Sequence, residues 1–224
     1  MRKFVIGALS GLSAVALCLG IGATPASATT ISYSLTIDHC TVLCGPQASF
    51  GQVDLNDFGG TGDVLVTVTL FNGNKFVNTG NGLDTTFDFN LSGAPSITTT
   101  QVTAGFGPAG AQTAGTHQFD GFGDFMYTMP RTLSGGNNAL AGPLSFHVLA
   151  SGINVFSFIG STTGFEFGAD ILSGTTGSTG PVGTTTGVCT SCTPVQLQAV
   201  PEPASLVLLG SGLIAVTSRL RRRR

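Results

Sequence analysis

Hydrophobic and polar residues alternate with a period of two over most of the chain, and short stretches of Gly, Asn and Pro separate the alternating runs. The clearest run is 63–70, where Val64, Val66 and Val68 share one face of an extended strand. Between the two ends of the chain the apolar residues show no helical spacing. Strands are expected at 31–37, 50–55, 63–70, 86–91, 96–102, 118–129, 143–149, 153–159 and 165–171.

About eight to ten short strands at close spacing predict an all-β fold, an antiparallel β-sandwich of the jelly-roll kind. Of the 16 phenylalanines, only Phe4 lies outside this region, and the chain has no tryptophan, so we expect a core filled by phenylalanine. Residues 72–74 are expected to form a hairpin turn, with 75–77 returning beside 63–70. Four polar side chains are expected to face solvent from their strands, namely Asp88, Asn90, Glu166 and Asp170.

Both ends carry apolar segments of a different kind. Met1-Arg2-Lys3 precedes an apolar stretch at 4–23, and Ala26-Ser27-Ala28 forms an A-x-A cleavage site before Thr29. Residues 1–28 therefore read as an N-terminal signal helix that is removed on export.

At the other end, Pro201 and Pro203 keep the backbone extended around Glu202, as a processing enzyme requires of its recognition strand. The uncharged stretch 204–218 predicts a short transmembrane helix, shorter than the roughly 20 residues that span a bilayer comfortably. A basic cluster then stops transfer and stays on the cytoplasmic side. It consists of Arg219, Arg221, Arg222, Arg223 and Arg224.

The Pro-Glu-Pro, the short apolar helix and the arginine cluster resemble, in order and spacing, the PEP-CTERM sorting signal of Gram-negative exported proteins. The resemblance implies that Pro201, Glu202 and Pro203 are recognised by an exosortase, a membrane cysteine transpeptidase, and that none of them is catalytic in this chain. It also implies a precursor tethered in the inner membrane and a mature protein at the cell surface or in the extracellular matrix. An ordinary C-terminal membrane anchor is the alternative. Residues 38–50, 76–82 and 120–125 resemble, more loosely, secreted PEP-CTERM proteins of unassigned function.

These segments divide the chain into a signal peptide at 1–28, a β-sandwich ectodomain at 29–172, a Ser/Thr/Gly-rich spacer with a Cys pair at 173–199, and the sorting tail at 200–224. Between 29 and 200 only Lys75 and Arg131 oppose ten acidic residues, a formal charge of −8. Such a surface repels phosphate backbones, which argues against nucleic-acid binding.

The expected mature chain has four cysteines, in a C-x3-C and a C-x2-C spacing, namely Cys40, Cys44, Cys189 and Cys192. Four thiolates are one way to hold zinc, but oxidation outside the cytoplasm favours disulfides. Three connectivities remain open, and we favour the local pairs Cys40–Cys44 and Cys189–Cys192 because the second pair follows a flexible spacer.

Catalytic and metal chemistry receives little support from the sequence. His39 precedes Cys40, but a disulfide competes with a Cys-His nucleophile pair; His117 and His147 lie in ordinary strand patterns. Two acidic clusters are candidates for calcium binding, but neither has EF-hand spacing. They are Asp54-Leu55-Asn56-Asp57 with Asp63, and Asp120 with Asp124. We expect no catalytic residue, no metal and no cofactor.

Three functions are compatible with this sequence. The first is a non-enzymatic protein of the cell surface or extracellular matrix, of structural or interaction type. The second is a carbohydrate-binding module associated with exopolysaccharide, although the usual aromatic cue is weak because the chain has no Trp and only Tyr33 and Tyr127 as tyrosines. The third is a secreted hydrolase.

Overall fold

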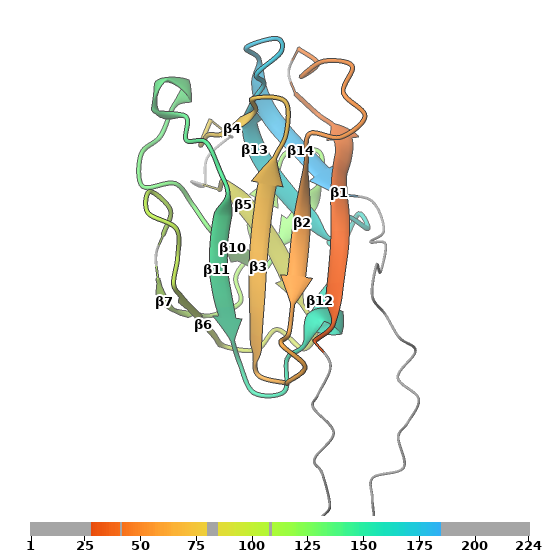
Figure 1. The fold of residues 1–224 in the computed structure, drawn as a ribbon, viewed down its shortest axis with the longest axis vertical. Coiled ribbons are helices and arrows are strands. Elements are labelled where there is room, and N and C mark those ends of the chain that lie inside the picture. Colours follow the sequence, from red (N-terminus) through yellow and green to blue (C-terminus); the bar gives the residue numbers. More distant parts are fainter. Residues whose placement is uncertain (1–27, 41, 80–84, 108, 185–224) are drawn as a thin grey trace, which may run out of the picture.

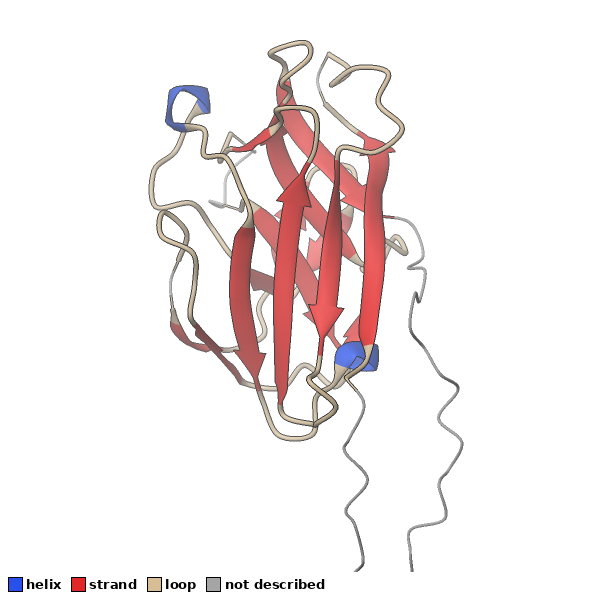
Figure 2. Cartoon of the chain, viewed as in Figure 1, coloured by secondary structure: helices blue, strands red, loops and turns tan. Residues whose placement is uncertain are grey.

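A computed structural model describes residues 28–40, 42–79, 85–107 and 109–184. Every strand pairing in it is antiparallel, so the predicted all-β antiparallel class is confirmed. Figure 2 shows strands throughout and two short 3-10 turns. The elements are β1 (Thr30–Asp38), β2 (Gly51–Asn56), β3 (Asp63–Leu70), β4 (Lys75–Phe76), β5 (Phe87–Leu91), β6 (Ile97–Thr100), β7 (Gly110–Gln112), β8 (His117–Phe119), β9 (Gly123–Phe125), β10 (Tyr127–Thr128), η1 (Gly136–Asn138), β11 (Leu144–Leu149), η2 (Val155–Ser157), β12 (Phe158–Ile159), β13 (Phe167–Leu172) and β14 (Thr179–Thr184).

The expected signal helix and short transmembrane helix lie outside the described residues. Within the described ranges, no helix has the length and apolar character needed to cross a bilayer.

One large sheet contains most of the strands, in the order β10-β5-β13-β14-β1-β2-β3-β11-β6-β7. The sheet folds over so that β1, β2, β3 and β11 form a front layer, with β14, β13 and β5 behind it (Figure 1). The two layers are joined by the β1–β14 pairing, in which Leu35 lies opposite Thr184. The fold is therefore two facing layers of one hydrogen-bonded sheet.

Phenylalanine rings fill the space between the layers, as the composition predicts. The ring of Phe87 in the back layer lies 6.1 Å from Phe146 of β11 and 5.7 Å from Phe167 of β13. In β2 and β3 buried residues alternate with half-exposed ones, so the predicted inward face of 63–70 is correct. Packing of this core fixes the position of the two layers relative to each other, and with it the position of the loops at their ends.

The turn at 72–74 does not lead into a returning hairpin strand. The positive φ angles of Asn72 (55°) and Gly73 (75°) make the turn, as predicted. However, β4 pairs with β13 of the other layer, through Phe76 opposite Ile171, and not with β3. Phe76 is fully buried there, edge-on to Phe106, and burying this ring outweighs continued pairing with β3.

The segment 118–129, predicted as one strand with a bend, is a hairpin followed by a separate short strand. β8 and β9 pair around the turn at Gly121, which has a φ of 78°. Phe119, Phe122 and Phe125 of this hairpin form a second apolar cluster. The segment 153–159 also differs from the prediction, because it forms η2 and then β12, which pairs with β5.

The hairpin packs on the outer face of the back layer, at positions where that layer has glycine. A Cβ added to Gly168 would lie 2.7 Å from the ring of Phe119, and one added to Gly183 would lie 2.1 Å from Phe122. Because both faces of the back layer are covered, the prediction that Asp88 and Asn90 face solvent is wrong: both are buried. Asp170 is also buried, with hydrogen bonds from Thr79.

The predicted domain boundary at residue 172 differs from the structure. Residues 173–178 form a tight turn, and β14 follows at the centre of the sheet, between β13 and β1. Val182 is fully buried although its neighbours are Gly, Thr and Pro. The first part of the predicted spacer therefore belongs to the folded domain; residues 185–199 lie outside the described ranges.

Candidate functional site

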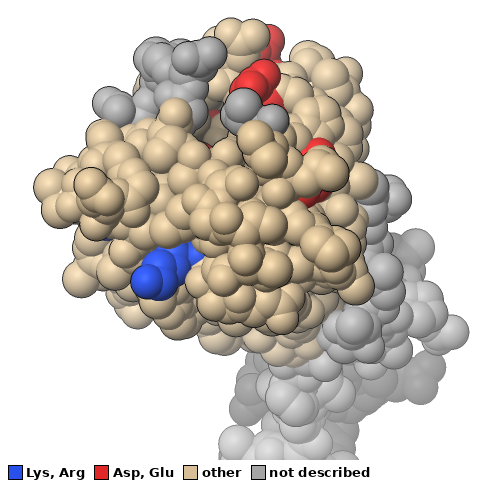
Figure 3. Space-filling model, turned by 90° about the horizontal axis from the view of Figure 1, so that it is seen from above, with Lys and Arg blue, Asp and Glu red and all other residues tan. Residues whose placement is uncertain are grey.

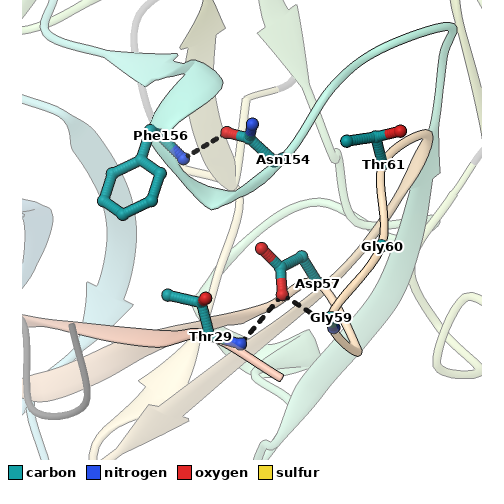
Figure 4. A pocket seen from close by; sticks show the side chains of 7 residues that line it. All are labelled: Thr29, Asp57, Gly59, Gly60, Thr61, Asn154 and Phe156. Carbon is teal, nitrogen blue, oxygen red and sulfur yellow. Dashed lines mark hydrogen bonds between the residues drawn. The ribbon is translucent and has the colours of Figure 1, made fainter. Parts of the chain in front are cut away.

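An open hollow of about 530 Å³ lies at the end of the sheet where β1 begins, between the β2–β3 loop and η2. This end is the lower one in Figure 1, and Figure 4 shows the hollow from close by. Its volume falls in the range of small-ligand sites. The lining residues are Thr29, Asp57, Gly59, Gly60, Thr61, Asn154 and Phe156.

Asp57 is the acidic group of this pocket and is only 7% exposed. Its Oδ1 accepts hydrogen bonds from the backbone nitrogens of Thr29 (2.9 Å) and Gly59 (3.0 Å). These bonds hold the loop after β2 in a turn, with Phe58 and Gly59 at φ of 52° and 75°. The second carboxylate oxygen points into the space between Thr29 and Phe156 (Figure 4). It receives no hydrogen bond from the described residues, so it is available to a ligand.

The opposite wall is fixed by a capping box around η2. Asn154 Oδ1 accepts from the backbone nitrogen of Phe156 at 2.9 Å, and Ser157 Oγ accepts from the backbone nitrogen of Asn154 at 3.0 Å. This arrangement leaves Phe156 54% exposed at the pocket. The exposed ring gives the pocket one flat apolar face, on which the apolar part of a ligand can pack.

A second exposed aromatic ring, Phe58, lies on the β2–β3 loop next to Asp57 in the chain but is not among the residues that line the pocket. Phe58 is 53% exposed and stacks on the imidazole of His147, with centroids 5.9 Å apart and planes 10° apart. The Nδ1 of His147 lies 2.8 Å from an oxygen of Asp63. The end of the sheet therefore offers exposed aromatic faces together with a carboxylate oxygen, a combination that suits a polyhydroxylated ligand.

The acidic cluster considered for calcium does not converge. Asp54 accepts from Ser32 Oγ and Gln52 Nε2, Asp57 holds the turn, and Asp63 contacts His147. Across the described ranges, one group of three metal-ligating side chains has its ligand atoms within 4.8 Å, namely Asp38, Cys40 and Cys44. Those two cysteines have the geometry of a disulfide, so they do not offer thiolates to a metal.

The Cys40–Cys44 pair is the favoured local one, with Cα atoms 5.6 Å apart. The carboxylate of Asp38 orders this loop, because its two oxygens accept from the backbone nitrogens of Cys40 and Cys44, each at 2.8 Å. His39 packs on Phe122 at 4.7 Å. Cys189 and Cys192 lie outside the described residues, as do Pro201, Glu202, Pro203 and the arginine cluster.

One charged side chain, Arg131, is structural in a way that the sequence did not indicate. Arg131 is buried beside Phe106 and donates to the backbone oxygens of Gly105 (3.0 Å) and Phe76 (3.2 Å), and burial lowers its pKa. Glu166, which the sequence predicts to face solvent, is half-buried, and burial raises the pKa of its carboxyl. Figure 3 shows few charged side chains on the opposite end of the domain. Because its guanidinium is buried and bonded to backbone carbonyls, Arg131 is unsuited to binding an anionic ligand.

Comparison with known proteins adds one finding. Residues 199–224 match the PEP-CTERM protein-sorting motif, the C-terminal sorting signal of exosortase substrates. The predicted resemblance of the tail is confirmed. The chain is thus an exported protein that is anchored as a precursor and processed by exosortase. No curated protein and no solved structure matches the chain.

Proposed function

We propose that the chain is a non-enzymatic protein of the cell surface or extracellular matrix that acts by interaction. The observation that carries this proposal is the sorting motif at 199–224, attached to a two-layered antiparallel domain. In this proposal the mature protein begins at Thr29, and the tail is cut at the Pro-Glu-Pro motif.

Fractionation of cells and medium, followed by mass spectrometry of the mature protein, tests this proposal. We expect the exported form to begin at Thr29 and to lack the terminal arginines. An intact arginine tail on most of the exported protein contradicts the processing step.

We further propose that the pocket at Asp57 binds polysaccharide, which gives the interaction a chemical class. Hydroxyl groups of a sugar are donors to the free carboxylate oxygen of Asp57, and the apolar C–H face of a sugar ring packs on an exposed aromatic ring. Phe156 provides such a ring in the pocket, and Phe58 provides another on the loop that carries Asp57.

A matched pair of phenylalanine substitutions tests carbohydrate binding in the mature chain. Phe156→Ala removes the ring at the pocket, and Phe71→Ala removes a 37% exposed ring outside it. We expect Phe156→Ala to weaken binding to purified exopolysaccharide by about tenfold, the upper end of an aromatic contact, and Phe71→Ala to leave it unchanged. Equal binding by both variants contradicts the assignment of the site.

A hydrolase has less support. Glycoside hydrolysis uses two carboxylates across the scissile bond, whereas Asp57 is the one carboxylate among the residues that line the pocket. Turnover of chromogenic glycosides or esters by the purified protein would favour the hydrolase, and we expect none.

A further inference from the structure

The position of the Thr29 nitrogen is set by the sheet. One step before β1, Thr29 donates from its nitrogen to Asp57 Oδ1 (2.9 Å), and its carbonyl accepts from the nitrogen of Asp57 (3.3 Å). This reciprocal pair extends the β1–β2 ladder past the Thr30–Asn56 register. The hydrogens on the Thr29 nitrogen, and any charge that this nitrogen carries, therefore lie next to the Asp57 carboxylate.

Within the described part of the chain, Asp57 has no cationic partner. It is 7% exposed, and the hydrogen bonds that its Oδ1 accepts come from neutral backbone nitrogens. Among the described residues no lysine or arginine pairs with it, and Arg131 is engaged by the carbonyls of Gly105 and Phe76. The Oδ1 side of this carboxylate is packed against backbone without a counter-charge, so a cation placed there would stabilise the fold.

The predicted signal-peptide cleavage falls at the bond that would supply this charge. Ala28 is exposed, so the Ala28–Thr29 bond is at the surface. Hydrolysis breaks its C–N bond, places the oxygen of water on the Ala28 carboxylate, and leaves the Thr29 nitrogen as a protonated amine at neutral pH. Before cleavage this nitrogen is a neutral amide with one hydrogen. After cleavage it is an ammonium group with three hydrogens and a positive charge.

We propose that signal-peptide cleavage creates the counter-ion of Asp57, and that the Thr29 α-ammonium forms a partly buried ion pair that locks this end of the domain. Hydrogen bonds to charged donors are stronger than those to neutral amides, so the mature chain is more stable than the precursor. Because Thr29 lines the pocket, the same step completes the pocket wall with a fixed cation. The proposal does not depend on which ligand the pocket binds.

Two forms of the chain, both running to Arg224, test the ion pair. One begins at Thr29, and the other keeps Ala26, Ser27 and Ala28 in front of it. Each is made as the wild type, with Asp57→Asn, and with Asp63→Asn, a carboxylate that contacts His147 instead. Urea unfolding is followed by circular dichroism, because the chain has no tryptophan.

We expect the folding equilibrium constant to be about tenfold larger for the chain that begins at Thr29. This advantage should vanish with Asp57→Asn and persist with Asp63→Asn. Equal stability of the two wild-type forms, or an advantage that survives Asp57→Asn, overturns the proposal. So does N-terminal sequencing that places the mature start elsewhere.

A second measurement needs no substitution, in case Asp57→Asn does not fold. The chain that begins at Thr29 has two amines, the Thr29 α-amine and the exposed Lys75 ε-amine. Acetylation of each is compared in the native and the urea-unfolded protein. We expect folding to slow the reaction of the α-amine about tenfold and that of Lys75 little. Equal slowing of both amines contradicts the ion pair.

Discussion

Replacing Asp88 by asparagine should stabilise the protein at neutral pH. Asp88 lies on β5 opposite Gly168 of β13, with its side chain fully buried, and neither carboxylate oxygen has a hydrogen-bond partner in the described residues. Thr128 is opposite it on β10, and its hydroxyl lies near the carboxylate but outside hydrogen-bond geometry. Asparagine has nearly the same shape and cannot ionise, so it removes the charge without opening a cavity.

Proton linkage gives the direction in which the stability of the wild type changes with pH. Burial raises the pKa of Asp88 well above its usual range, and the nearby Thr128 hydroxyl offsets this only in part. In the unfolded chain the same carboxyl has the pKa of a free aspartate, about 3.9. Above that pH the unfolded state releases a proton that the folded state retains, so the stability of the wild type falls as pH rises toward the folded pKa.

A buried polar group without a partner costs about 1–3 kcal/mol, and an ionised one costs more. Asp88→Asn keeps a buried polar side chain but removes the ionisation cost, so we expect a gain of at least about 1 kcal/mol at pH 7. For a domain of this size that gain raises the Tm by roughly 2–4 °C. Below about pH 3, where aspartate is mostly protonated in both states, the two proteins should be equally stable.

Thermal and urea unfolding of the mature chain between about pH 3 and pH 8 measures this effect. Asp124→Asn is the matched control, because Asp124 is an exposed carboxylate on β9 and its change should stay within about 0.5 kcal/mol. Some loss of stability with pH should remain in Asp88→Asn, since burial raises the pKa of Glu166 in the same direction. A variant less stable than the wild type at pH 7 refutes the reasoning and means that the carboxylate binds a partner, such as a cation.

Three further predictions concern the covering hairpin, the cysteines and the tail. Gly183→Ala puts a methyl group 2.1 Å from the ring of Phe122, so we expect a loss of about 1–3 kcal/mol in urea unfolding; an unchanged midpoint would mean that the hairpin does not pack there. Non-reducing peptide mapping should find Cys40 linked to Cys44, and a link from either to the C-terminal cysteines would show the local pairing to be wrong. Glu202→Ala should leave precursor in the inner membrane, and a normal surface yield of this variant would count against recognition of the Pro-Glu-Pro motif.

The front layer was predictable because only one of its faces is covered. In β2 and β3 the buried and half-exposed residues alternate, and the sequence alternates with them, so the strand 63–70 was placed with its correct inward face. A period of two carries this information whenever one side of a sheet faces solvent.

The back layer was not predictable by the same rule. All five residues of β5 are buried, so the alternation of Phe87, Asp88 and Phe89 does not report exposure. The covering hairpin fits over Gly168 and Gly183, which in a sequence indicate only a weak strand or a bend. β14 was missed for a similar reason, because Ser, Thr and Gly are typical of spacers and its burial comes from its neighbours on both sides.

The two ends of the chain and the pocket differ in how far sequence can reveal them. A sorting tail is recognised as an extended segment, so its residues are contiguous and its meaning can be read in order, as the match at 199–224 shows. The pocket joins Thr29 to Asp57 and to Phe156 across β1, β2 and η2, and no local spacing relates these positions. Only the register of β1 against β2 shows that the predicted cleavage site lies beside a buried carboxylate. The signal peptide and the folded domain thus meet at Thr29. In our proposal, removal of the signal peptide places a positive charge beside Asp57 of the domain.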